Sequence, residues 1–209
     1  MARPRSPEAH EKVLHAALAL FGERGIEGAS MDAIARAAQV SKATIYNHWP
    51  DKEALLLEVM LWVNGLNPNT DHEKEDPDSG SLERDLTIVL SRRPPRLFEE
   101  ARKRITPSLI AYSATHKEFG IAWRSRVMEP GRKCIKRILR RAQRRGQLQS
   151  NLNMDTAIAI LLGPMLYQHI FEKDVRRSRS GIASHVAQTF CKAFARNCEN
   201  SSKNTSGRA

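Results

Sequence analysis

Apolar residues recur along the chain at the three- and four-residue spacing of amphipathic helices, and the two-residue alternation of strands is almost absent. The first such stretch follows Ser6 and Pro7, residue types that favour the start of a helix. Its expected buried stripe is Val13, Leu14, Ala17, Leu18 and Phe21. Gly22 and Gly25 are expected to end this helix. The pattern predicts an all-α fold.

Three shorter helices are expected between residues 30 and 63. Their expected caps are Ser30, Ser41 and Asp51, each just before a helical stretch. The expected inward residues of the second helix are Ile34, Ala37 and Ala38. A tight turn at Gln39 and Val40 leads to the third helix, which Pro50 should stop. Two short helices joined by such a turn are typical of a helix-turn-helix.

The third helix, residues 42–49, has a narrow apolar face. At 100° per residue, Ile45 and Trp49 lie on one side, and Asn47 points nearly opposite. Ala43 and Thr44 lie beside Asn47, and Tyr46 and His48 lie on the two flanks. A helix that is largely polar outward is poor core material, so its outer side is expected to contact something polar and specific.

Duplex DNA fits this face, because a major groove admits one helix and presents donors and acceptors on base edges. Asn47 suits an adenine edge, and Ala43 allows close approach or contacts a thymine methyl group. The expected contacts to bases or phosphates are Lys42, Thr44, Tyr46 and His48, with Ser30 and Lys52 on phosphates. Arg3 and Arg5 form a basic arm that either reaches a minor groove or has no role. We predict a DNA-binding domain over residues 1–55.

The remaining chain, residues 56–198, is expected to be helical, with a polar tail over 199–209. An acidic stretch, residues 67–80, is expected to be a mobile loop. Helices should resume at Ser81, break at Pro94-Pro95 and end with a cap at Gly146. The segment 154–171, which Asn153 should cap and Gly163-Pro164 should kink, is apolar around most of its circumference. It is expected to be buried on more than one side, Ile158 included. A last helix is expected over residues 181–197, with one apolar stripe formed by Ile182, Val186, Phe190, Ala193 and Phe194.

The net charge of +11 favours an anionic partner, but its location complicates that reading. Residues 1–52 carry seven basic and six acidic side chains, whereas residues 124–145 carry ten basic and one acidic. The second region is either a solvated helix face over a buried stripe or an auxiliary contact to phosphates or an anionic ligand. The buried stripe would be Ile135, Ile138, Leu139 and Ala142.

The sequence contains no motif typical of catalysis, metal binding or cofactor binding. The chain shows no HExxH, no glycine-rich phosphate loop and no CxxC, so we expect no enzyme, no metal site and no cofactor. Three cysteines without paired spacing favour a reduced compartment. No apolar signal core or membrane-spanning run is present, and a cytoplasmic location without membrane contact is expected.

Residues 28–56, GASMDAIARAAQVSKATIYNHWPDKEALL, resemble the DNA-binding domain of the tetracycline-repressor family of bacterial regulators. The resemblance covers residues 8–58 and includes Thr44-Ile45-Tyr46 and Lys52-Glu53-Ala54-Leu55. Gln39 stands where the family usually has glycine, so a left-handed turn there would carry strain. Asn47 occupies a variable position, so no operator sequence is implied.

The resemblance implies a homodimer that binds operator DNA and releases it when a small-molecule effector binds the helical domain. The dimer interface would be formed by helices 154–171 and 182–197, unless both belong simply to the monomer core. Residues that could line the effector cavity are Trp62, Tyr112, Phe119, Trp123, Met128 and Met165. The alternative is a helical small-molecule-binding or enzyme scaffold whose helix-turn-helix is vestigial. The outward donors on helix 42–49 favour the DNA-binding regulator over this alternative. By the resemblance, that regulator would be a repressor.

Overall fold

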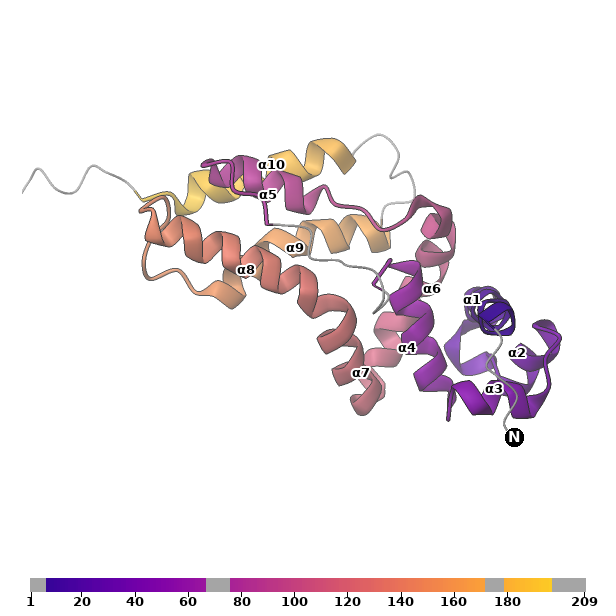
Figure 1. Ribbon diagram of the computed structural model, residues 1–209. Helices are drawn as coiled ribbons and strands as arrows, with labels where there is room; N and C mark the ends of the chain where they lie inside the picture. Colours follow the sequence, from indigo (N-terminus) through magenta and orange to yellow (C-terminus); the bar gives the residue numbers. More distant parts are fainter. Residues whose placement is uncertain (1–6, 67–75, 172–178, 197–209) are drawn as a thin grey trace, which may run out of the picture. The chain divides into compact units, whose positions relative to one another are not determined.

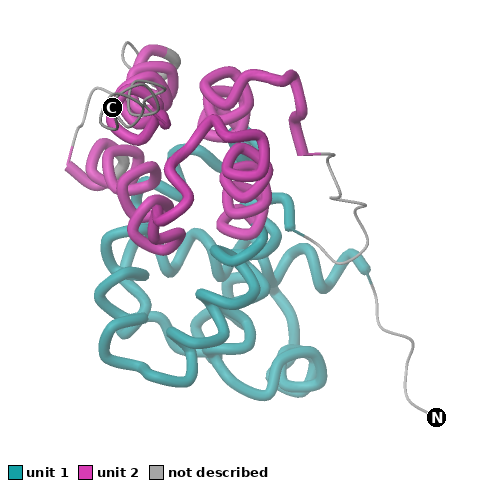
Figure 2. The backbone as a smooth tube through the Cα atoms, turned by 90° about the vertical axis from the view of Figure 1, so that its left-hand side faces the viewer, with its two compact units in different colours: residues 1–74, 93–130 teal, residues 75–92, 131–209 magenta. Residues whose placement is uncertain are grey.

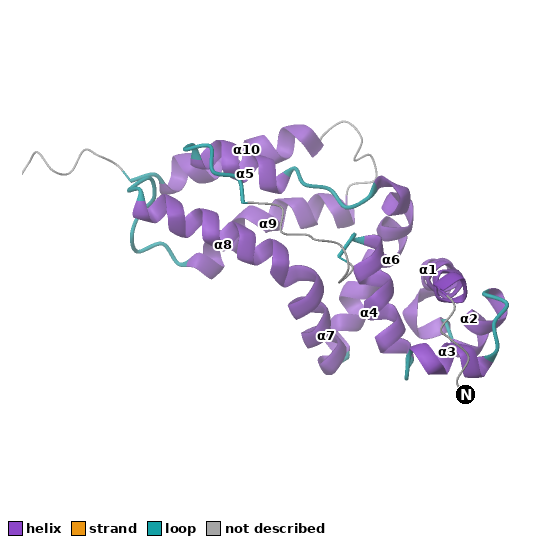
Figure 3. Cartoon of the chain, in the orientation of Figure 1, coloured by secondary structure: helices purple, strands orange, loops and turns teal. Residues whose placement is uncertain are grey.

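A computed structural model describes residues 7–66, 76–171 and 179–196 of the chain. These residues form helices joined by turns and short loops, and no strand occurs in the described ranges (Figures 1 and 3). The first helices are α1 (Pro7–Gly28), α2 (Met31–Ala37), α3 (Lys42–His48), α4 (Lys52–Val63) and α5 (Leu82–Leu90). After a 3-10 turn, η1 (Arg96–Phe98), come α6 (Glu99–Thr115), α7 (Lys117–Trp123) and a π-helical turn, η2 (Arg124–Met128). The last helices are α8 (Glu129–Arg144), α9 (Met154–Phe171) and α10 (Arg179–Phe194). The predicted all-α class is confirmed.

The chain divides into two compact units, coloured separately in Figure 2. Unit 1 comprises residues 1–74 and 93–130, and therefore combines α1 to α4 with α6 and α7. Unit 2 comprises residues 75–92 and 131–209, with α5, most of α8, α9 and α10. By packing, the helix-turn-helix thus shares one unit with α6 and α7. The functional boundary at residue 55 remains a prediction, and the expected tail 199–209 and the arm with Arg3 and Arg5 lie outside the described residues.

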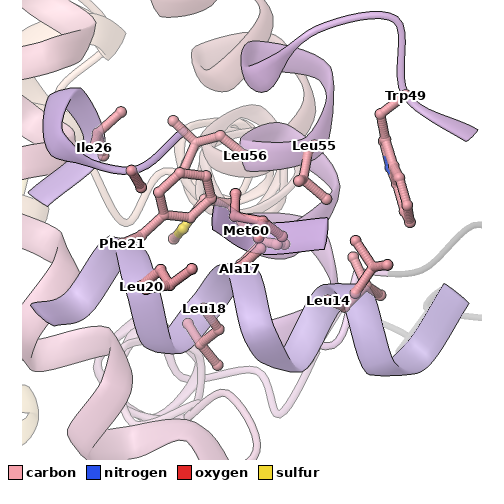
Figure 4. Packing of buried hydrophobic residues seen from close by; sticks show 14 of the residues in the cluster. Leu14, Ala17, Leu18, Leu20, Phe21, Ile26, Trp49, Leu55, Leu56 and Met60 are labelled. Atoms are coloured by element: carbon pink, nitrogen blue, oxygen red, sulfur yellow. The ribbon is translucent and has the colours of Figure 1, made fainter. Parts of the chain in front are cut away.

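The core of unit 1 is built from the stripe predicted on α1. All five stripe residues are buried, and Figure 4 shows Phe21 among Leu56 and Met60 of α4. Gly25 breaks the helical geometry with φ of 72°, a left-handed conformation that glycine adopts without a Cβ clash. Gly22 stays helical, so the prediction that it ends the helix was wrong. In α2, Ala35 is buried and Ala37 is exposed, which reverses the predicted role of Ala37.

Helix α4 is buried nearly all around and is held by α6. The guanidinium of Arg102, 8% exposed, donates to the carbonyl of Val63 at 2.6 Å, which satisfies an acceptor in the last turn of α4. Near the start of α4, the Tyr112 hydroxyl donates to a carboxylate oxygen of Glu53 at 3.1 Å. Burial, together with this carboxylate, raises the pKa of Tyr112 to about 12. Both ends of α4 are therefore fixed by polar contacts to the same helix.

Unit 2 has a separate core between α5, α8, α9 and α10. It includes the predicted stripe of α8, namely Ile135, Ile138, Leu139 and Ala142. Asn153 caps α9 as predicted, since its side-chain oxygen accepts the Thr156 N–H at 3.0 Å. Gly146, with φ of 69°, follows α8, and Leu148 folds back into the core as the predicted cap requires. None of the helices in the described ranges is long and apolar enough to cross a membrane.

Helix α9 has two apolar faces, of which the subunit buries only one. Ile158, 1% exposed, lies in the core of unit 2, as does Phe190 of α10 at 2%. Ile160, Tyr167 and Phe171 follow one another at i, i+7 and i+11 and are 41%, 61% and 67% exposed. Pro164 lies inside α9, which is continuous from Met154 to Phe171. The apolar residues around the circumference of α9 therefore form two faces, one in the core of unit 2 and one exposed.

The described end of the acidic loop is bonded to arginines of α8 and to Arg145, which directly follows that helix. Asp76 pairs with Arg137, and Arg145 reaches both oxygens of Asp78 at 2.6 and 3.0 Å. These guanidinium groups hold the pKa of Asp76 and of Asp78 below the usual range, because they favour the ionised carboxylate. Residues 67–75 of the predicted mobile loop lie outside the described residues. Residues 76–80 make hydrogen bonds or ion pairs with other parts of unit 2.

A second arginine of α8, Arg141, binds a buried carboxylate. The Asp85 side chain is 3% exposed and accepts from the Ser79 hydroxyl at 2.6 Å, the Ser79 N–H at 2.9 Å and Arg141 at 3.3 Å. Arg141 also donates to the carbonyl of Pro77. The two Ser79 contacts connect the segment before α5 to α5 itself, and the two Arg141 contacts connect that segment and α5 to α8. The Asp85–Arg141 pair thus joins parts of unit 2 that are 56 residues apart.

Candidate nucleic-acid interface

Helix α3 is a short helix defined by its cap. The Ser41 hydroxyl accepts the N–H of Thr44 at 3.0 Å and lies 2.8 Å from the Thr44 hydroxyl, which confirms the predicted cap. After His48 the backbone becomes extended, and the N–H of Trp49 bonds to the carbonyl of Ile45 at 2.9 Å. The following Pro50 lacks an N–H and cannot continue the helix.

The two faces of α3 are as predicted. Ile45 is fully buried and Trp49 is 2% exposed, and Figure 4 shows Trp49 facing Leu14 of α1. On the other side, Ala43, Tyr46 and Asn47 are exposed, and Thr44 and His48 are half-buried. The outer face of α3 thus presents one amide, two hydroxyl groups and an imidazole around a small alanine. These groups can read both donors and acceptors on base edges.

The turn before α3 is left-handed at Gln39, whose φ is 56°. Such a conformation costs a residue with a Cβ roughly 1–2 kcal/mol. Two backbone hydrogen bonds close the turn, from Gln39 to Arg36 at 3.1 Å and from Val40 to Ala35 at 3.0 Å. The strain expected from the sequence is therefore present, and the surrounding hydrogen bonds and core contacts hold α3 at its angle to α2.

A carboxylate on α4 fixes the end of α3. The indole N–H of Trp49 donates to Glu58 Oε2 at 2.6 Å, and His10 Nε2 of α1 lies 2.7 Å from Glu58 Oε1. The His10 ring also stacks on Trp49, with centroids 4.9 Å apart and planes inclined by 26°. Glu58 thereby connects α1, α3 and α4. The sequence offered no local signal for this, because Glu58 is 48 residues from His10 and contacts it only in the folded chain.

Replacing Glu58 with alanine should destabilise unit 1 by about 1 kcal/mol. The indole N–H would lose a charged acceptor, and the cost falls at the low end of the usual range because the Glu58 side chain is 39% exposed and water can partly replace it. Urea unfolding followed by tryptophan fluorescence would measure this, since Trp49, Trp62 and Trp123 all belong to unit 1. Glu11→Ala is the matched control, because its contact to His15 is exposed and 3.8 Å long. Equal losses in both variants would contradict the proposed clamp.

The three expected phosphate contacts differ in how the fold uses them. Lys42 is 68% exposed and pairs with Asp32 at 2.5 Å, a surface pair that stabilises the chain little and can yield to a phosphate. The Ser30 hydroxyl caps α2 by accepting the Ala33 N–H at 3.2 Å. Lys52 instead donates to the carbonyls of Ile26 and Glu27 at 2.8 and 3.4 Å. Lys52 therefore has a role within unit 1 in addition to any role on DNA.

The expected effector-lining residues do not all lie in one unit. Tyr112 and Phe119 are buried in the core of unit 1 with their rings 5.4 Å apart, edge to face. Trp62 packs on Phe98, with centroids 4.3 Å apart. Trp123 and Met128 also belong to unit 1, whereas Met165 belongs to unit 2. Within the described part of the chain, the buried indole N–H of Trp123 has no hydrogen-bond partner.

The geometry defines a class of protein. A capped short helix that is anchored on its inner face and carries hydrogen-bonding groups on its outer face, after a helix and a tight turn, is a helix-turn-helix that reads DNA. Residues 13–59 match the family model described as "Bacterial regulatory proteins, tetR family", and residues 76–187 match "Tetracyclin repressor-like, C-terminal domain". The second match alone spans more than half of the chain. The chain therefore belongs to the tetracycline-repressor family and is a transcriptional regulator, as the motif resemblance predicted.

Individual proteins are similar to this one over most of its length. It is 29% identical over 172 residues to YdeS, an uncharacterized HTH-type transcriptional regulator of Bacillus subtilis, covering 82% of this chain and 83% of YdeS. It is also 29% identical over 182 residues to the HTH-type transcriptional regulator SrpR of Pseudomonas putida, covering 83% and 82%. The solved structure of MexZ from Pseudomonas aeruginosa has the same fold, with a TM-score of 0.62, 22% identity and coverage of 90% and 95%.

Proposed function

We propose that this regulator is a homodimeric repressor that a small molecule releases from operator DNA. The observation that carries the proposal is the exposed, hydrogen-bonding face of α3, held from behind by the buried Ile45 and Trp49. A helix anchored in this way can enter a major groove without unfolding its own support. Two copies in a dimer would place two such helices in major grooves about one helical turn apart. Selection of duplexes from a random pool, followed by gel shift with the selected sequence, tests this directly.

We assign roles on the operator by chemistry and exposure. Asn47 would pair with an adenine edge and Ala43 would contact a thymine methyl group, because both are exposed at the centre of the outer face. Tyr46, which is 49% exposed, would contact phosphate or base from one flank. The remaining contacts to bases or phosphates would come from Thr44, His48, Lys42, Ser30 and Lys52.

Asn47→Ala should cost roughly 1–3 kcal/mol of operator binding per half-site and should relax base preference at the contacted position. The amide would be removed without loss of stability, because Asn47 is exposed and contributes nothing to the core. Binding titrations against the selected operator and its single-base variants measure both effects. Asn151→Ala, at an exposed position in unit 2, is the matched control.

A comparison with Lys42→Ala separates base reading from phosphate binding. Removal of a phosphate-binding side chain should weaken binding to all sequences alike and lower the salt slope by about 1. Lys52→Ala is less suited to this purpose, since it also removes two hydrogen bonds to the carbonyls after Gly25. If Asn47→Ala left affinity and base preference unchanged, the assignment of Asn47 would be wrong.

We place the dimer interface on α9, which has the expected bounds 154–171, and on α10, which spans Arg179–Phe194 where a helix over 182–197 was expected. The exposed apolar face of α9 supports this, because Tyr167 and Phe171 are more than half exposed in the single chain and their rings lie 5.1 Å apart. Large adjacent apolar side chains left in water mark an association surface. A symmetric dimer would bury this face against its own copy.

The effector is proposed to bind within unit 1, next to Trp123. A buried indole N–H without a partner carries a desolvation cost that a ligand acceptor could remove. The nearby aromatic and methionine candidates favour a ligand with an apolar body and one acceptor. Met165, which belongs to unit 2, is not part of this proposed site. Helix α4 would transmit the effect, since it contacts α6 at both ends and α3 through Glu58.

Linkage provides the test of effector action. A compound that releases operator must bind the free protein more tightly than the DNA-bound protein, by the same factor in both directions. Titrating each hit of a thermal-shift screen with and without operator measures that factor, and equal affinities exclude the compound as an inducer.

We propose no catalytic activity. The described residues contain no group of three or more histidine, cysteine, aspartate or glutamate side chains that could hold a metal ion. Because the proposed partner is chromosomal DNA, we assign the protein to the cytoplasm, with neither a cofactor nor a membrane as a partner.

A further inference from the structure

The outer face of α8 carries a row of basic side chains. At about 100° per residue, Lys133, Arg140 and Arg144 project within an arc of about 40°, opposite the buried stripe of the helix, and Lys136 lies beside them. Three of these residues are exposed and Lys136 is half-buried. Among the described residues, none of the four has a hydrogen bond or an ion pair. We call Lys133, Lys136, Arg140 and Arg144 the outer basic stripe.

The fold neutralises the neighbouring flank of the same helix and leaves this stripe charged. Arg137, Arg141 and Arg145 all bind carboxylates of the segment 76–85, as described above. The one acidic residue of α8, Glu129, lies in its first turn, away from most of the stripe. Lys136, Arg140 and Arg144 are four residues apart, a spacing at which like charges destabilise a helix by a few tenths of a kcal/mol per pair. An anionic partner would remove this repulsion.

The shape of the stripe favours an extended polyanion. Its charges follow one another every three or four residues, about 5 Å apart along the helix axis, over a length of about 16 Å. Duplex DNA offers one charge per ~1.7 Å of its axis, and lysine and arginine are the usual ligands of its phosphates. A convex helix face is a poor site for a small anion, which needs several converging donors.

A membrane surface fits less well. A helix that lies in a lipid interface inserts an apolar face beneath the headgroups. In α8 the large apolar residues are committed to the core of unit 2, since Ile135, Ile138 and Leu139 are at most 2% exposed. No large apolar side chain is exposed along the described helix α8.

We propose that the outer basic stripe is a second, sequence-independent contact to the phosphate backbone of duplex DNA. The inference rests on the proposed operator binding by α3, which would bring DNA to the protein. The stripe would add affinity and salt dependence without adding base preference, because phosphates are the same in every sequence. A phosphate contact at the stripe would also explain why the excess positive charge lies in residues 124–145 and not in residues 1–52, which are nearly neutral.

The test compares two full-length variants with the same net charge. The first replaces Lys133, Lys136, Arg140 and Arg144 with glutamine. The second, the control, replaces with glutamine Arg84, Arg93, Lys117 and Lys192, which are exposed and unpaired among the described residues. Affinity for a 60-base-pair duplex with the selected operator at its centre is measured between 50 and 200 mM salt. Removing one lysine or arginine from a phosphate should lower the slope of log K against log salt by about 0.9.

We expect the slope of the stripe variant to fall by about 2–4 per protomer while its base preference is kept, and the slope of the control variant to change by less than about 1. Equal changes in the two variants, or an unchanged slope in the stripe variant, would overturn the inference while leaving operator binding by α3 intact. It would also be overturned if the stripe substitutions abolished binding to phosphatidylglycerol vesicles and left DNA binding unchanged. Failure of the wild-type chain to bind any duplex would instead refute the proposed function.

Discussion

Tyr167→Asp should convert the dimer to a monomer and lower operator affinity by roughly 10²–10⁴. The side chain is 61% exposed in the single chain and lies at the centre of the exposed apolar face of α9, between Ile160 and Phe171. In a two-fold interface each substitution occurs twice, so two carboxylates would be buried without partners. Loss of the second reading helix removes the gain in affinity that comes from linking two half-sites. Sedimentation at micromolar concentration and gel shift on the selected operator measure the two effects.

Leu97→Asp is the matched control for this experiment, since Leu97 is an exposed apolar residue, 82% exposed, that belongs to unit 1. It should leave the dimer intact. Charges at Ile158 or Phe190 would not serve, because both side chains are buried in the core of unit 2 and a charge there would disrupt folding first. A wild-type chain that sediments as a monomer at micromolar concentration would refute the interface.

Asp85→Ala should destabilise unit 2 by about 1–3 kcal/mol. The variant removes the buried carboxylate that Arg141 contacts at 3.3 Å and leaves Arg141 with the more exposed Asp78, 3.4 Å away. It also removes the acceptor for the hydroxyl and N–H of Ser79. Urea unfolding followed by far-ultraviolet circular dichroism measures the loss. Tryptophan fluorescence is a poor probe here, because all three tryptophans lie in unit 1.

Asp78→Ala provides the comparison for Asp85→Ala. Asp78 and Arg145 are 43% and 41% exposed, and exposed ion pairs contribute little to stability. Asp78 also contacts Arg141 at 3.4 Å, but Arg141 keeps the buried Asp85 when Asp78 is removed. The loss should therefore be much smaller, and hydrogen exchange in α5 and α8 should rise only in the Asp85 variant. Similar losses in the two variants would mean that burial of Asp85 is not what makes its pair important.

Local features were determined by the sequence alone. The caps at Ser30, Ser41, Asp51 and Asn153 were all correctly predicted, because a cap depends on a hydroxyl, carboxylate or amide two or three residues from the N–H that it accepts. The two faces of α3 were predicted for the same reason, since helical geometry relates Ile45 to Trp49 without reference to the rest of the chain. These local features carried the family resemblance and hence the function.

Burial that depends on neighbouring helices was predicted less well. Ala37 and Ala35 are equally apolar, and only the packing of α2 decides that Ala35 faces the core. In α9 the sequence showed apolar residues on nearly every side, but it could not assign Ile158 to the subunit core and Tyr167 to an exposed face. That division arises because α5, α8 and α10 cover one side of α9 and leave the other to solvent.

Long-range polar contacts were decided by the tertiary structure. The sequence showed an acidic loop and a basic helix as separate features, yet Asp85 and Arg141 form one buried pair across 56 residues. Likewise Glu58 connects Trp49 to His10, and Lys52 binds the carbonyls of Ile26 and Glu27 in addition to any contact with phosphate. Such contacts require side chains distant in sequence to meet at hydrogen-bond distance, and no periodicity along the chain encodes that meeting. The sequence therefore determined which helices form and which groups α3 presents on its outer face, and the tertiary structure determined what holds α3 in place.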